Sequence, residues 1–208
     1  LVSLDIVFGV VCGSYFASRI FEITPSIYFW ITLVSAVWVI YTADHLLDGI
    51  RTKKKFVFET YRFHFDNRIV LMSIGIVTVL VSSIFVLFFL EKELIIYGVS
   101  TFVLVIIYLF LNNIFRKRRR FFPKELIISA LYSWGIFGGV LILKGNVTFF
   151  QVLVIANYFL LVSVNVLLFS YFDSEEDRVS HFNTLTVNFG KKLTRRSIFF
   201  ILAIAFLI

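Results

Sequence analysis

The apolar run Val147–Phe172, VTFFQVLVIANYFLLVSVNVLLFSYF, exceeds the roughly 20 residues that a helix needs to cross a hydrocarbon core. It ends at the stretch Asp173-Ser174-Glu175-Glu176-Asp177, in which four of the five residues are acidic. A smaller acidic stretch, Asp44-His45-Leu46-Leu47-Asp48, follows an earlier apolar run. Lone strands cannot satisfy their backbone in lipid, so this pattern predicts an all-α bundle of transmembrane helices whose ends carry acidic clusters.

The composition indicates the same class of protein. Of the 208 residues, 60% are hydrophobic, 19% are aromatic and only 16% are charged. A soluble domain cannot bury that much apolar surface, so we expect an integral membrane protein. We expect that membrane to be a bacterial inner (plasma) membrane. The net charge of +7 fits basic loops that contact anionic lipid headgroups. We therefore expect membrane lipid as a partner and no nucleic acid.

The apolar stretches divide the chain into transmembrane segments within a single membrane domain, residues 1–208. They predict about seven helices, at Leu1–Phe21, Ser26–Thr42, Ile69–Leu90, Leu94–Phe115, Glu125–Leu143, Val147–Phe172 and from Ser197 onward. The second stretch is short, so we expect its helix to continue through Asp44 and Asp48. The chain starts with Leu and stops inside an apolar run, so we expect a fragment truncated at the C-terminus and at the N-terminus.

The basic residues predict the orientation in the membrane. Segments 51–68, 116–124 and 173–196 hold 17 of the 20 Lys and Arg residues, and they fall on alternate connections between the apolar stretches. Such a bias places basic loops in the cytoplasm. Both acidic clusters flank these loops, so we expect both on the cytoplasmic side.

Each acidic cluster holds two aspartates four residues apart, which on a helix share one face. Like charges this close repel unless a cation lies between them or one carboxyl stays protonated. Mg2+ prefers such oxygen ligands and bridges carboxylates to phosphates. We therefore predict that the clusters face each other and hold Mg2+ for a diphosphate. The residues expected to be catalytic and to bind metal are Asp44, Asp48, Asp173 and Asp177.

Basic residues follow both clusters and are suited to bind the free oxygens of a diphosphate. An interior rich in Phe, Tyr and Trp would accept an isoprenoid tail and stabilise an allylic cation. Asn165 lies two helical turns before Asp173 and is expected to line the cavity below the metals. The residues expected to bind substrate are Arg51, Lys54, Arg178, Lys191 and Asn165.

These motifs resemble those of the UbiA superfamily of intramembrane prenyltransferases. The first motif is Asp44-x3-Asp48 with Arg51-Thr52, and the second is Asp173-x3-Asp177-Arg178 with Thr184-Leu185 and Gly190. The resemblance implies nine helices in the full chain around a central cavity. It also implies Mg2+ and a polyprenyl diphosphate at the cytoplasmic mouth, and transfer of the prenyl group to a small acceptor, often aromatic.

Two alternatives stay open. The family's first motif usually opens with Asn-Asp, whereas the matching positions here are Ile40 and Tyr41. That difference permits a degenerate protein that binds an isoprenoid lipid without catalysis. The other alternative is a cation carrier, although carriers place carboxylates near the membrane midplane among broken helices. Here the acids lie at helix ends, and Pro25 and Pro123 both lie in loops.

Three further patterns predict packing. Gly135, Gly138 and Gly139 give the fifth apolar stretch a small-residue face for close helix contact. The segment around His64 predicts an interfacial helix with aromatic anchors. Asparagines are costly in lipid, so those within the spans should face the bundle interior. They are Asn112, Asn113, Asn157 and Asn165.

Overall fold

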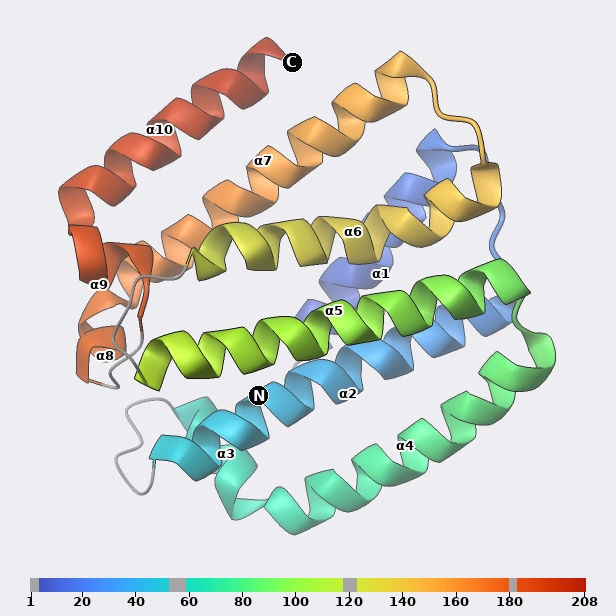
Figure 1. Cartoon of the computed structure of the whole chain (residues 1–208), viewed down its shortest axis with the longest axis horizontal. Coiled ribbons are helices and arrows are strands. Elements are labelled where there is room, and N and C mark those ends of the chain that lie inside the picture. The colour runs from blue at the N-terminus through green and yellow to red at the C-terminus, as the bar shows by residue number, and fades with distance from the viewer. Residues whose placement is uncertain (1–3, 53–58, 118–122, 180–182) are drawn as a thin grey trace. The chain divides into compact units, whose positions relative to one another are not determined.

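A computed structural model describes residues 4–52, 59–117, 123–179 and 183–208 of the chain, and these residues form helices and no strands (Figure 1). The all-α prediction is confirmed. In chain order the helices are α1 (Leu4–Ile20), α2 (Ile27–Thr52), α3 (Glu59–Asp66), α4 (Arg68–Phe89), α5 (Lys92–Lys117), α6 (Lys124–Lys144), α7 (Phe149–Phe172), α8 (Ser174–Val179), α9 (Leu185–Phe189) and α10 (Lys191–Leu207).

Five of these helices, α2, α4, α5, α6 and α7, are long and apolar enough to cross a membrane. The remaining predicted spans correspond to α1 and α10, which have 17 residues each. As expected, α2 continues through Asp44 and Asp48 to Thr52. Large apolar side chains stay exposed along α4, among them Leu87 and Phe88, as lipid-facing residues do. The chain is an integral membrane protein.

The chain divides into two compact units, Leu1–Ile96 and Tyr97–Ile208, and each is described by itself. The single membrane domain over residues 1–208 stays a prediction. In the first unit α2 and α4 run antiparallel. The ring of Tyr28, at the start of α2, stacks on that of Phe89, at the end of α4, with centroids 4.4 Å apart. Toward the other end, α3 brings His64 to the end of α2, where its ring centroid lies 4.9 Å from that of His45.

The second unit is built on α7. On one side α7 contacts α6, where the rings of Phe137 and Tyr158 meet edge to face at 5.2 Å. On another side it contacts α10, where the Asn157 side chain donates a hydrogen bond of 2.8 Å to the carbonyl of Ala205. Asn157 therefore bonds between helices, as predicted for an asparagine inside a span.

Helices α5 and α6 approach each other at Gly138. A Cβ atom added there would lie 3.0 Å from Cζ of Tyr97 on α5, which is too close for an ordinary contact. The Tyr97 hydroxyl donates to the carbonyls of Trp134 and Gly135, at 2.9 and 3.2 Å. The predicted close contact is confirmed at Gly138, whereas a Cβ at Gly135 would meet no atom within 4 Å.

Candidate active site

The second acidic motif begins at the residue that ends α7. The backbone N–H of Asp173 donates to the carbonyl of Phe169 at 2.9 Å, and the chain then turns into α8. The Ser174 hydroxyl donates to the carbonyl of Tyr171 at 3.0 Å and stabilises this turn. The N–H of Asp177 donates to the carbonyl of Asp173 at 2.8 Å, so the two aspartates lie one helical turn apart, as the spacing predicts.

Asp177 is buried, with 8% of its surface exposed, and its surroundings oppose its ionisation. Burial, and to a smaller extent the neighbouring charges of Asp173 and Glu125, raise its pKa to about 6. Lys124 and a hydrogen bond from the Thr184 hydroxyl act in the opposite direction but do not compensate for burial. Partial burial also raises the pKa of Asp173. Water therefore screens the charge of Asp177 poorly, whereas Glu175 and Glu176 of the same stretch are exposed.

The short helix α9 is bound at its first residues to several other helices of the second unit (Figure 1). Thr184 is its N-cap, and its hydroxyl accepts from the N–H of Val187 at 3.3 Å. The N–H of Leu185 donates to Oε1 of Glu125 on α6 at 2.6 Å. A helix of five residues is not stable alone, so these contacts determine its position.

A buried chain of hydroxyl groups continues from α9 to its neighbours. Thr186 Oγ1 lies 2.9 Å from Ser170 Oγ on α7 and 3.0 Å from Thr194 Oγ1 on α10. All three side chains are buried. This chain of hydroxyls attaches the loop after the second motif to α7 and α10.

Sequence reasoning missed Glu125, which it treated only as the first residue of an apolar stretch. The side chain is 2% exposed, and its Oε2 atom is buried without a hydrogen-bond partner. The available signal was an acidic residue at the start of a span, beside Pro123 and Lys124. Its partner Leu185 lies 60 positions later, so no local pattern connects the two.

The basic residues predicted beside the second motif lie on the surface. Arg178 and Lys191 are both exposed, and Nζ of Lys191 lies 5.5 Å from the ring centroid of Tyr171. Asn165 is also exposed on α7. Their predicted contacts with substrate stay predictions.

The first acidic motif lies on the last turns of α2 in the first unit. Asp44 is half-buried, and it directly precedes His45, whose ring meets that of His64. The backbones of Asp48 and Arg51 lie in α2, but their side chains lie outside the described residues, as does the whole of Lys54.

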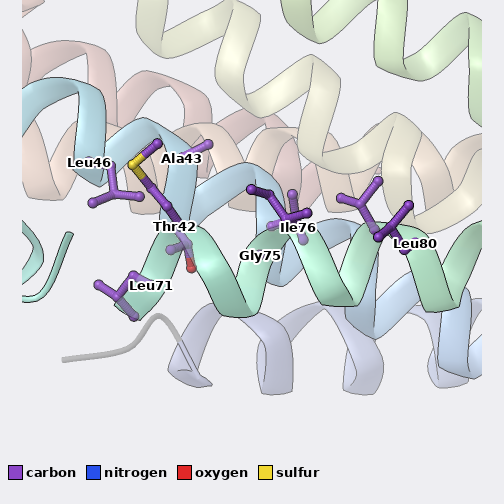
Figure 2. A pocket seen from close by; sticks show the side chains of 10 residues that line it. Thr42, Ala43, Leu46, Leu71, Gly75, Ile76 and Leu80 are labelled. Carbon is purple, nitrogen blue, oxygen red and sulfur yellow. The ribbon is translucent and has the colours of Figure 1, made fainter. Parts of the chain in front are cut away.

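An apolar groove begins beside this motif, between α2 and α4 (Figure 2). It encloses about 310 Å³. Ala43 and Leu46 line its upper part, and Gly75, Ile76 and Leu80 continue it along α4 (Figure 2). Ala43 immediately precedes Asp44, so the groove starts at an acidic helix end and runs along apolar side chains.

The structure thus brings Asp173, Asp177, Thr184 and Glu125 together within the second unit. Among the residues that the structure describes, no three His, Cys, Asp or Glu side chains are placed to hold a metal ion. The predicted metal site requires carboxylates from both motifs, and the pairing of the motifs stays a prediction.

Comparison with known families identifies the chain. The model of the UbiA prenyltransferase family matches residues 67–208, which is more than half of the sequence. The chain belongs to the UbiA prenyltransferase family. The matched residues include Asp173, Asp177 and α9, and they begin after Asp44 and Asp48. No curated protein and no solved structure matches the chain.

Membership of the UbiA family implies the activity that its members share. Its members are membrane prenyltransferases that act on a prenyl diphosphate and an acceptor and that generally depend on a divalent metal. Asp173 and the buried Asp177 of the second motif fall inside the family match.

Proposed function

We propose that this protein transfers a prenyl group from a polyprenyl diphosphate to a small, aromatic acceptor within the membrane, with Mg2+ bound at acidic motifs on the cytoplasmic side. The observation that carries the proposal is the buried Asp177, which accepts a hydrogen bond from Thr184 at the start of α9 and lies one helical turn from Asp173, inside the region that matches the family. Burial of carboxylates is costly unless a partner compensates for their charge. The Mg2+ that binds the diphosphate would be such a partner.

The donor chemistry of the second motif fits Mg2+. Hard divalent cations take carboxylate oxygens and keep part of their water, which two aspartates on one helical face permit. The raised pKa of Asp177 reflects chiefly its burial, and a bound cation would lower that pKa. In this proposal Asp173 and Asp177 hold the metal together with Asp44 and Asp48.

The proposed reaction is an alkyl transfer. The bond between the allylic carbon and oxygen breaks, and the electron pair leaves with the diphosphate, whose developing charge bound Mg2+ would neutralise. Arg51, Lys54, Arg178 and Lys191 would bind the outer oxygens of the leaving group. The acceptor then supplies the electron pair of the new bond and releases its proton to water at the mouth of the site.

The groove between α2 and α4 supports the choice of an isoprenoid substrate. Its wall is almost wholly apolar, and it starts one residue from Asp44 (Figure 2). A hydrocarbon chain placed there would keep its diphosphate at the acidic end of α2. Burial of each methylene contributes about 0.8 kcal/mol, so a chain of several isoprene units would bind firmly.

Turnover in proteoliposomes tests the proposal. We expect Mg2+-dependent consumption of a prenyl diphosphate, lost in chelator and reduced at least about 100-fold in Asp44→Ala or Asp173→Ala, because each variant removes a metal ligand. Glu175→Ala is the matched control, since it removes an exposed carboxylate from the same acidic stretch. Unchanged turnover in chelator and in both aspartate variants would refute the proposal.

A second candidate is a family member that binds isoprenoid lipid without turnover. The observation that favours it is Ile40-Tyr41 at the positions where the first motif usually has Asn-Asp. Saturable binding of a prenyl diphosphate, with no product across a panel of acceptors, would support this candidate over the transferase.

A further inference from the structure

We propose that Glu125 is a positioning residue for the second acidic motif. Its carboxylate holds the first residue of α9, and through Thr184 it sets the position of Asp177. This inference rests on the proposed function, because it assigns to Glu125 a part in arranging the same site. Neither the composition nor the two aspartate motifs point to this residue.

The contact between Glu125 and α9 is short and shielded from water. Oε1 of Glu125 lies 2.6 Å from the backbone nitrogen of Leu185, and the side chain is 2% exposed. A hydrogen bond to a carboxylate is roughly twice as strong as one between neutral groups. Exclusion of water strengthens it further, so the N-terminus of α9 is fixed to the first turn of α6.

Thr184 transmits this position to Asp177. It directly precedes Leu185, and its hydroxyl donates to the Asp177 carboxylate while accepting from the N–H of Val187. A hydroxyl has one hydrogen to donate and two lone pairs to accept, so both bonds form at once. Displacement of Leu185 would therefore move the hydroxyl that orients Asp177.

The other oxygen of Glu125 argues against a purely stabilising role. Oε2 is buried without a hydrogen-bond partner. A buried oxygen without a partner lowers stability relative to an apolar side chain of the same shape. The carboxylate nevertheless accepts a hydrogen bond from the N–H of Leu185. We infer that this bond sets the position of the second acidic motif.

Two conservative variants separate position from charge. Glu125→Gln keeps an acceptor oxygen at the same reach and removes the charge, whereas Glu125→Asp keeps the charge and is one methylene shorter. We expect the Gln variant to retain kcat within about threefold and the Asp variant to lose at least about tenfold, because small displacements at a reacting site are costly. KM for the acceptor should change little in either variant.

Hydrogen exchange at the Leu185 amide is a second measurement, and it does not require turnover. We expect exchange at least about tenfold faster in Glu125→Asp than in wild type, and near wild type in Glu125→Gln. The control is Glu175→Gln, which removes an exposed carboxylate and should change neither reading.

Three results would overturn the inference: an active Asp variant with a protected Leu185 amide, a Gln variant as impaired as the Asp variant, or a loss of kcat without faster exchange. Absence of turnover in wild type would instead contradict the proposed function. In that case the exchange readings would still decide whether Glu125 holds α9.

Discussion

At the scale of single residues, Asp177 is where burial and charge conflict. Its folded pKa of about 6 lies above the ordinary value of 3.8, chiefly because of burial. Between these two values the folded state binds more protons than the unfolded state, so stability falls as pH rises. Above about pH 6 the full cost is present, on the order of 1–3 kcal/mol in the absence of metal.

The variant Asp177→Asn tests this cost directly. Asparagine can still accept from Thr184 but cannot ionise, so we expect it to raise the free energy of unfolding at neutral pH by about 1–3 kcal/mol. Near pH 4, where Asp177 is largely protonated, the difference should nearly vanish. The measurement is unfolding in detergent without Mg2+, at both pH values. A variant that is less stable than wild type at neutral pH would contradict the raised pKa.

At the scale of helices, the contact between α5 and α6 depends on the missing side chain of Gly138. Gly138→Ala would place a methyl group against the ring of Tyr97, whose hydroxyl is bonded to carbonyls of α6. We expect a loss of roughly 1–3 kcal/mol in the free energy of unfolding, as for other overpacked sites. Gly135→Ala is the matched control, since its methyl group meets no atom within 4 Å. Equal stability of the two variants would show that this contact is not tight.

The long helices were predictable because they follow from local composition. The apolar runs gave the spans, and the short second run correctly implied that α2 continues past Asp48. The helices α8 and α9 were not predicted, because short helices owe their stability to partners far away in sequence. Leu185 meets Glu125, and Thr186 meets Ser170 and Thr194.

The asparagines of α7 show that the side of a helix on which a residue lies is hard to predict from composition. The same rule placed Asn157 and Asn165 in the interior: Asn157 bonds to α10, whereas Asn165 is exposed within the second unit and its place in the bundle stays a prediction. Eight residues at 100° per residue leave the two side chains about 80° apart around the helix. Composition alone cannot distinguish such positions.

At the scale of the whole molecule, each unit carries one acidic motif. The first motif lies at the end of α2 and the second at the end of α7. The distribution of Lys and Arg predicts that both ends face the cytoplasm. The proposed site requires more than this, because the two motifs must meet at one mouth to share a metal-bound diphosphate.

The distance between the two motifs tests this requirement most directly. Cys12 is the single cysteine, so spin labels can be attached in a Cys12→Ser background at Leu47 and Glu175, two exposed positions beside the motifs. A control pair at Leu47 and Asn146 should span the bilayer, whose hydrocarbon core is about 30 Å thick. For the motif pair in lipid, the proposal predicts a distance well below about 30 Å. A distance as long as that of the control pair would contradict it.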